Sequence, residues 1–184
     1  MLRPGSCRRQ DLLLRLSAMT TPKPYQVLFV CTGNSARSIL AEALLNSMGK
    51  GRFQAWSAGS RPTGLVNPLT LETLATLQLP SGHCRSKSWH EFAGPQAPAL
   101  DFVFTVCDQA AGESCPVWPG QPISAHWGLP DPAAVQGSDA QRRQAFMDTA
   151  LTLKRRIELM LALPVASLER LSLQTALREI GSKT

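Results

Sequence analysis

The fold is decided by one stretch, Tyr25-Gln-Val-Leu-Phe-Val-Cys31-Thr-Gly-Asn-Ser-Ala-Arg37-Ser38. Residues 25–30 are mostly apolar and rich in β-branched and aromatic side chains, which favours a buried strand. Turn-forming residues follow, and residues 39–45 (Ile-Leu-Ala-Glu-Ala-Leu-Leu) are strong helix formers. The pattern therefore predicts a strand, a tight loop and a helix in succession.

The same alternation continues along the chain. We expect further strands at 53–58, 101–107 and 123–127, and further helices at 68–79, 139–163 and 167–180. Asn67 before Pro68 is typical of a helix start, and the helix at 139–163 has apolar residues along one face. Strand–helix units with apolar strands indicate an α/β fold whose parallel sheet is covered on both faces.

Length and composition indicate a single globular domain. The chain has 184 residues, 43% hydrophobic and 17% charged, and no apolar run approaches the ~20 residues of a membrane-spanning helix. The net charge of +6 would suggest a nucleic-acid partner. However, residues 1–24 hold five basic side chains and one acidic one, so most of the excess lies in this segment. We therefore expect no nucleic acid and no membrane among the partners.

The basic segment also suggests how the chain is divided. It ends in Met19-Thr-Thr-Pro-Lys-Pro24, which favours an extended linker because helix is disfavoured before proline. We expect a flexible extension over 1–24, a folded domain over 25–165 and a helix in 166–184 that packs on the domain or trails it. Arg15 interrupts the apolar residues 12–14, which are too few for a secretory signal. A transit peptide and an upstream non-native start remain as alternatives, and a cytoplasmic location is favoured.

The loop at residues 31–38 has the features of an anion cradle. Ligands of such sheets bind at the carboxyl ends of strands, where backbone N–H groups and a helix N-terminus attract anions. Gly33 permits the turn, and Arg37 can offer two N–H groups to a tetrahedral oxyanion. We expect this positive environment to lower the pKa of the Cys31 thiol and make it a nucleophile. The expected oxyanion-binding residues are Thr32, Gly33, Asn34, Ser35, Ala36, Arg37 and Ser38, with Asn34 and Ser38 also donating to the sulfur.

The alternative for this loop is a buried cysteine beside a surface arginine, which the strand before it and the helix after it argue against. A second element supports the chemistry. Asp131, in His126-Trp-Gly-Leu-Pro-Asp131-Pro132, follows the last expected strand and so lies at the same sheet edge. Its carboxyl group can protonate a departing oxygen and later activate water. Asp-Pro is equally ordinary in turns, so Asp131 alone decides nothing.

The five cysteines are Cys7, Cys31, Cys84, Cys107 and Cys115. Their odd number and irregular spacing favour catalytic or inert thiols over disulfide staples. Cys107 ends a strand at the edge where Cys31 lies, and Cys115 follows in a polar, glycine-containing segment that we expect to move. The alternative for Cys107 is a small buried hydrophobe. We expect Cys7 and Cys84 to be incidental and no metal site, because the histidines form no ligand spacing with the cysteines.

Several motifs then occur in the order of a known family. Residues 31–38, their continuation 39–42, Ser57-Ala-Gly59 and Asp131-Pro132 resemble the low-molecular-weight protein tyrosine phosphatase superfamily, and within it the arsenate reductases built on that fold. The resemblance covers roughly residues 25–165. It implies a four-stranded parallel sheet flanked by helices, a flavodoxin-like three-layer sandwich, with a phosphatase-like catalytic domain over 25–165. We also expect a monomer.

The resemblance implies two competing activities. A phosphatase that hydrolyses phosphomonoesters through a Cys31 phosphoenzyme needs Cys31, Arg37 and Asp131, commonly with tyrosines after the Asp-Pro. Here Ala133-Ala134 follows, and the only tyrosine is Tyr25. An arsenate reductase needs further thiols, which Cys107 and Cys115 supply. We therefore favour arsenate reduction in arsenic detoxification, keep the phosphatase as the alternative, and regard a non-catalytic anion-binding module as a weaker third.

The expected mechanism uses the thiols in turn: Cys31 attacks arsenate, Cys107 attacks the Cys31 sulfur, and Cys115 resolves the disulfide by thiol exchange. No tightly bound cofactor is expected, only an external thiol donor. The segment between Cys107 and Cys115 looks more like reductases that use glutathione with glutaredoxin, and thioredoxin stays open. Thioredoxin-coupled relatives can bind potassium near the loop. Asn34, Glu42 and Ser57 match part of that site, but its acidic ligand has no secure equivalent, so potassium is doubtful.

Overall fold

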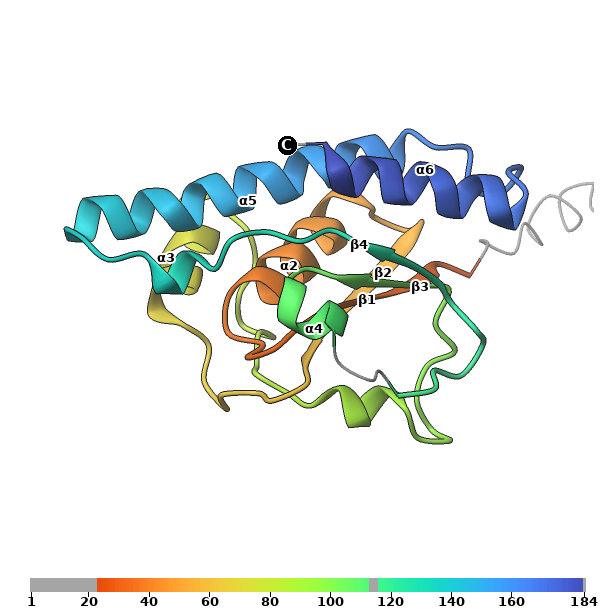
Figure 1. Ribbon diagram of the computed structural model, residues 1–184, viewed down its shortest axis with the longest axis horizontal. Coiled ribbons are helices and arrows are strands. Elements are labelled where there is room, and N and C mark those ends of the chain that lie inside the picture. The colour runs from red at the N-terminus through yellow and green to blue at the C-terminus, as the bar shows by residue number, and fades with distance from the viewer. Residues whose placement is uncertain (1–22, 113–115, 184) are drawn as a thin grey trace, which may run out of the picture.

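The computed structural model describes residues 23–112 and 116–183 and contains one four-stranded sheet (Figure 1). Its strands lie in the spatial order β2-β1-β3-β4, and every pairing is parallel. The strands are β1 (Tyr25–Cys31), β2 (Phe53–Gly59), β3 (Phe102–Thr105) and β4 (Ile123–His126). The predicted fold class, a four-stranded parallel sheet flanked by helices, is confirmed.

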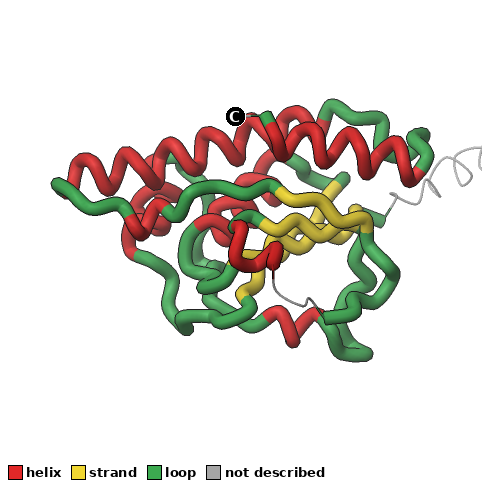
Figure 2. The backbone as a smooth tube through the Cα atoms, viewed as in Figure 1, coloured by secondary structure: helices red, strands yellow, loops and turns green. Residues whose placement is uncertain are grey.

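The helices connect the strands and cover the sheet. They are α2 (Arg37–Met48), α3 (Pro68–Thr76), α4 (Asp108–Gly112), α5 (Asp139–Leu161) and α6 (Arg170–Ser182), with short 3-10 turns η1 (Trp89–Phe92) and η2 (Pro132–Ala134). Figure 2 shows α5 and α6 lying together along one side of the sheet. Asn67 caps α3 as predicted, since its side chain accepts from the Leu69 N–H.

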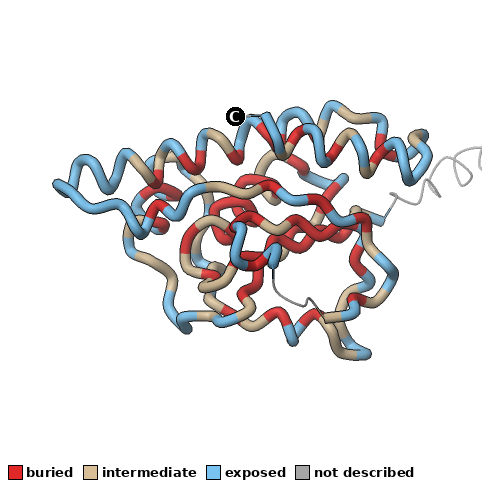
Figure 3. The backbone as a smooth tube through the Cα atoms, in the orientation of Figure 1, coloured by how far each residue is buried: buried red, intermediate tan, exposed pale blue. Residues whose placement is uncertain are grey.

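The core lies on both faces of the sheet (Figure 3). On the side of α6, Phe29 and Phe104 stack with a centroid distance of 5.5 Å, and Trp127 packs 4.3 Å from Phe104. The Trp127 indole donates to the Leu177 carbonyl at 2.9 Å, which fixes α6 beside β4. The other face is covered by the segment around η1, where Phe92 contacts Trp56 of β2. These contacts bury the strands from both faces of the sheet.

The expected elements differ from the structure by a few residues at their ends, as in β4, α5 and α6. The strand expected at 101–107 ends at Thr105, and the helix expected at 68–79 ends at Thr76. The segment after Cys107 was expected to be a mobile loop, but its first residues form α4. The Cys107 sulfur accepts from the Ala110 N–H at 3.4 Å, a local bond that favours the helical turn. Across the described ranges, no helix is both long and apolar enough to span a bilayer.

Candidate functional site

The loop between β1 and α2 forms a cup of backbone amides at the carboxyl edge of the sheet. The loop is bound from outside by backbone N–H groups of the segment after β2. These groups, from residues 60, 61, 63 and 67, donate respectively to the carbonyls of Cys31, Thr32, Gly33 and Ser35. Because the C=O and N–H of a trans peptide plane point in opposite directions, turning these carbonyls outward turns the following N–H groups inward. The concave side is therefore lined with donors, as an oxyanion requires.

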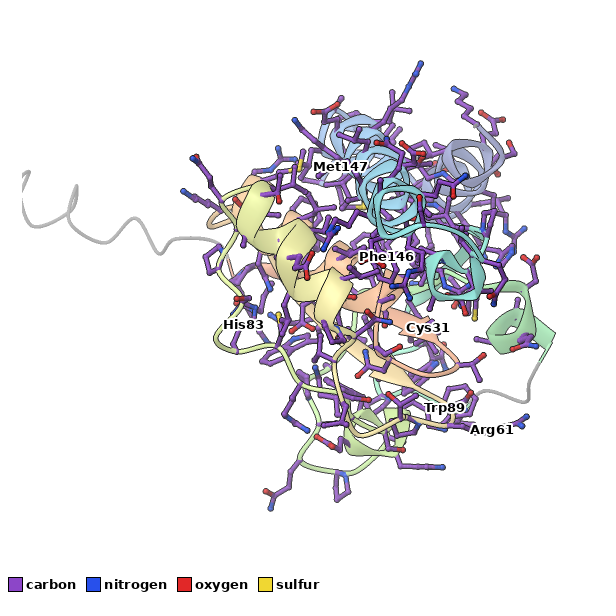
Figure 4. The ribbon with its side chains drawn as sticks, turned by 90° about the vertical axis from the view of Figure 1, so that its left-hand side faces the viewer. Cys31, Arg61, His83, Trp89, Phe146 and Met147 are labelled. Atoms are coloured by element: carbon purple, nitrogen blue, oxygen red, sulfur yellow. The ribbon has the colours of Figure 1, made fainter. Side chains whose placement is uncertain are left out.

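Cys31 lies at the base of this cup, where β1 ends (Figure 4). Its side chain is buried, and its sulfur accepts from the Asn34 backbone N–H at 3.2 Å. The Ser38 hydroxyl lies 3.0 Å from the same sulfur. Both expected partners are thus in place, although Asn34 reaches the sulfur through its backbone and not through its side chain.

The Asn34 side chain has a different task. Asn34 has a φ of +44°, and its carboxamide oxygen accepts from the Lys87 backbone N–H at 2.7 Å. This bond identifies the nitrogen of the amide, which donates to Ser38 Oγ at 2.9 Å and Ser57 Oγ at 3.0 Å. Since Ser38 Oγ accepts from Asn34, its own hydrogen is free to point at the Cys31 sulfur.

The electrostatic expectation for Cys31 is wrong. Burial raises the pKa of the Cys31 thiol, and the hydrogen bonds from Ser38 and Asn34 lower it by less. Burial is the largest cause, and the Arg37 guanidinium does not offset it, because this side chain is bound to other partners. Arg37 Nη1 donates to the Leu129 carbonyl at 2.9 Å and Nη2 lies 3.3 Å from Asp131 Oδ2, so its charge is shared with these groups and not with the sulfur. The thiolate therefore depends on the donors of the cup.

Asp131 is tied to the loop through Arg37, whose Nη2 lies 3.3 Å from Asp131 Oδ2. Its carboxylate also caps η2, where Oδ1 accepts from the Ala133 N–H at 3.1 Å. The side chain is 45% exposed, so it can exchange protons with water. The residues that follow, Pro132-Ala-Ala134, offer no aromatic ring to a substrate.

Cys107 is brought to the edge of the cup by the neighbouring strand. β3 pairs with β1, and the buried Cys107 sulfur lies 3.5 Å from the hydroxyl of Thr32, the residue after Cys31. Its proximity to Cys31 also contributes to the raised pKa of that thiol. Asp108 follows Cys107, and its Oδ1 lies 3.0 Å from His126 Nε2. The other ring nitrogen of His126, Nδ1, contacts the Thr105 hydroxyl. Cys115 lies outside the described residues.

Lys87 and Glu42 form a buried pair beside the Asn34 amide. Their Nζ–Oε2 distance is 3.4 Å, and Glu42 also accepts from the Ser57 hydroxyl. The role of Lys87 was not predicted. Lys87 lies between the helix expected at 68–79 and the strand expected at 101–107, and charge alone does not distinguish a buried ammonium from a solvated one.

Among the residues that the structure describes, the one further cysteine is Cys84. Cys84 is partly buried against the core, and burial and Glu42 raise its pKa to about 11. Cys7 lies outside the described residues. No group of three or more metal-ligating side chains occurs in residues 23–112 and 116–183.

Comparison with known proteins gives the family. The family described as "Low molecular weight phosphotyrosine protein phosphatase" matches residues 26–171, which include the cup, Cys107 and Asp131. The chain belongs to this family. Within the low molecular weight phosphatase family, the chain is similar to proteins named arsenate reductase. That of Shouchella clausii is 32% identical over 120 residues, covering 65% of this chain and 83% of the relative. That of Halalkalibacterium halodurans is 30% identical over 132 residues, covering 72% and 91%.

Solved structures of this phosphatase family agree with the fold. The arsenate reductase from Archaeoglobus fulgidus aligns with a TM-score of 0.54 at 29% identity, covering 72% of this chain and 98% of that one. A thioredoxin-dependent arsenate reductase from Corynebacterium glutamicum aligns with a TM-score of 0.51 at 25% identity, covering 82% and 71%. Both named reductases thus share the overall fold of this chain.

Proposed function

We propose that this protein is an arsenate reductase that uses Cys31 as its nucleophile. The observation that carries the proposal is the second buried thiol at the cup, with Cys107 Sγ 3.5 Å from Thr32 Oγ1. Hydrolysis of a phosphoester needs one thiol, whereas reduction of arsenate needs a second to take up the oxidising equivalents. The names of the relatives support the same choice.

The first step joins arsenate to Cys31. The inward amides of residues 32–36 and the Arg37 guanidinium bind the oxyanion, with Ser38 holding the attacking sulfur. The Cys31 thiolate forms an S–As bond, and a hydroxide leaves arsenic with a proton from Asp131, as water. Asp131 is suited to this role because it is bound to Arg37 on one side and open to solvent on the other.

The electrons move in the second step. The Cys107 thiolate attacks the Cys31 sulfur, the S–As bond breaks, and its electron pair stays on arsenic as arsenite. The two sulfurs are left as a Cys31–Cys107 disulfide. Cys115 then attacks Cys107, which frees Cys31 as a thiolate and leaves a Cys107–Cys115 disulfide. Disulfide geometry needs Cα atoms within about 7 Å, so each exchange requires the two cysteines involved to approach to that separation.

An external thiol closes the cycle by reducing the Cys107–Cys115 disulfide. The relative from Corynebacterium glutamicum is thioredoxin-dependent by name, which supports thioredoxin, and glutathione with glutaredoxin is the alternative. The protein needs no tightly bound cofactor and acts as a cytoplasmic monomer.

The deciding experiment is a paired assay of the purified protein. Arsenite release is measured with thioredoxin and with glutathione and glutaredoxin, beside hydrolysis of an aryl phosphate. We expect arsenite turnover with at least one donor and slow hydrolysis. Rapid hydrolysis without arsenite under either donor would instead establish the phosphatase.

The resolving role of Cys115 is tested by Cys115→Ser. Without the third thiol the cycle stops at the Cys31–Cys107 disulfide, so the variant should release about one arsenite per enzyme and then stop. Quenched samples analysed by mass spectrometry should contain that disulfide. Cys84→Ser is the matched control and should turn over normally. Steady turnover by Cys115→Ser would refute the relay.

We also propose that residues 25–165 form the catalytic domain, with residues 1–24 as an extension. None of the contacts of the cup involves residues before Tyr25 among those described. A chain that begins at Lys23 should keep the wild-type kcat and Tm. A kcat lowered by more than a factor of two, or a Tm lowered by more than a few degrees, would show that the extension contributes to activity or stability.

A further inference from the structure

Lys87 is a buried cation placed one layer behind the nucleophile. Its side chain is 4% exposed and that of Glu42 is 5% exposed. The ammonium nitrogen lies 3.4 Å from Glu42 Oε2, 3.3 Å from Ser57 Oγ and 3.5 Å from the Arg85 carbonyl. Oxygen atoms are the ligands that hard cations take in proteins, and three of them surround this buried positive charge.

The ammonium group occupies the place that a potassium ion would need. The oxygens available to such an ion are those of Glu42, Ser57 and the Arg85 carbonyl, and all three already contact Lys87 Nζ. A second positive charge there would be repelled at close range in a low-dielectric interior. The residues present therefore do not fit a potassium ion.

The hydrogen bonds from Lys87 to Cys31 run in one direction. Lys87 Nζ and Asn34 Nδ2 both donate to Ser57 Oγ, so the Ser57 hydrogen goes to Glu42. The Lys87 backbone N–H holds the Asn34 amide in one orientation. Asn34 then donates to Ser38, which leaves the Ser38 hydrogen for Cys31. The ammonium and amide N–H groups can only donate, so they fix the direction of each hydrogen bond in this network.

We propose that the Lys87 ammonium is the resident cation of this site and positions Cys31 through Ser57, Asn34 and Ser38. Lys87 is a positioning residue, since it touches neither Cys31 nor the oxyanion cup with its side chain. Removing its charge leaves Glu42 buried without a counter-ion, frees Ser57 to reorient and loosens the Asn34 amide. The Ser38 hydrogen bond to the sulfur is then lost for part of the time. The proposal rests on Cys31 being the nucleophile of the proposed function.

The surroundings of Lys87 allow a test in which an added ion takes the place of the ammonium group. A cavity of about 370 Å³ lies against the pair, lined also by Trp56, His83, Arg85 and Glu91. His83, labelled in Figure 4, lies in the loop segment after α3. Ions from solvent can therefore reach the space that a shortened side chain leaves.

The experiment measures iodoacetamide alkylation of Cys31, resolved from the other cysteines by peptide mass spectrometry, in the full chain without arsenate. Lys87→Met keeps the length of the side chain and removes the charge, and Lys87→Ala leaves a space. The exposed Lys50→Met is the matched control. We expect alkylation at pH 7 to fall about tenfold in both Lys87 variants and to be unchanged in the control. Potassium chloride, compared with tetramethylammonium chloride at equal ionic strength, should restore the rate and raise the Tm in Lys87→Ala alone.

Two outcomes would overturn the proposal: wild-type alkylation in Lys87→Met, or a Lys87→Ala rate that potassium does not raise above tetramethylammonium. The potassium titration of Lys87→Ala decides the matter even where Lys87→Met is too unstable to purify. A merely structural lysine would not give potassium-specific recovery. Because no arsenate is used, the result stands apart from the proposed function, which fails only if wild type reduces no arsenate.

Discussion

At the scale of single residues, the reactivity of Cys31 is a balance between burial and donated hydrogen bonds. Burial raises the pKa of this thiol, and Ser38 is the largest opposing influence. The folded protein therefore holds the proton on sulfur more strongly than an exposed cysteine would. Reaction near neutral pH depends on the hydroxyl 3.0 Å away and on the amide of Asn34.

Replacement of this hydroxyl gives the first prediction at this scale. Ser38→Ala removes a donor to the thiolate, so the pKa of Cys31 should rise further. Its alkylation rate at pH 7 should fall about tenfold for each unit of that rise, because only the thiolate reacts. Rates measured from pH 6 to 10 should converge with wild type at the alkaline end. Ser47→Ala, in the same helix α2, is the control. Equal profiles for Ser38→Ala and wild type would contradict the assignment.

At the scale of elements, the cup is held from outside by the segment after β2. Gly59, the last residue of β2, pairs with Cys31 in the sheet. An added Cβ at Gly59 would lie 2.6 Å from the Thr32 carbonyl oxygen and 3.0 Å from Asn34 Cβ. The close approach of these two backbones therefore requires glycine, and it fixes the loop before any anion binds.

The second prediction follows from this approach. Gly59→Ala should push the Thr32 carbonyl away and turn the inward amides, which weakens anion binding by about tenfold or more. The free energy of unfolding should fall by about 1–3 kcal/mol, as for other overpacked sites. Phosphate titration calorimetry and urea unfolding measure the two effects. Gly82→Ala is the control, since an added Cβ there meets nothing within 4 Å. Unchanged phosphate binding in Gly59→Ala would show that the loop adapts.

Much of the structure at the scale of elements could be predicted from the sequence, and the exceptions have physical causes. The buried strand β1, the helix after it and the cap at Asn67 each depend on local pattern, which adjacent residues display. The direction of Arg37 and the burial of Lys87 depend on partners far along the chain, Asp131 and Glu42. The helix α4 depends on a sulfur accepting one N–H bond. Such contacts exist only after the strands are paired, so no local pattern displays them.

At the scale of the whole molecule, α6 closes the sheet beside β4. Leu173, Leu177 and Ile180 are buried there, and the Trp127 indole donates to the Leu177 carbonyl. Arg156 of α5 donates to the carbonyls of Trp127 and Gly128 at 2.9 and 3.2 Å. Both helices thus hold the chain that runs from β4 toward Asp131.

The third prediction concerns this closure. Gly181 of α6 packs so closely on the His126 carbonyl that a Cβ would overlap it, and Trp127 Cδ1 would lie 2.7 Å away. Gly181→Ala should displace α6 and lower the free energy of unfolding by about 1–3 kcal/mol. Thermal unfolding compared with Gly94→Ala, where no atom lies near, measures this. A Tm equal to that of the wild type would mean that α6 can shift without a loss of stability.

The order of the strands has one further consequence. Cys31 and Cys107 are 76 positions apart in the chain, yet β1 and β3 are neighbours in the sheet, about 4.8 Å apart in the hydrogen-bonding direction. The cup belongs to β1 and the second thiol to the segment after β3. An exchange of the segment between β3 and β4 would therefore remove the second thiol and leave the cup after β1 in place. We expect such a chimera to lose the proposed arsenate reduction and to keep oxyanion binding.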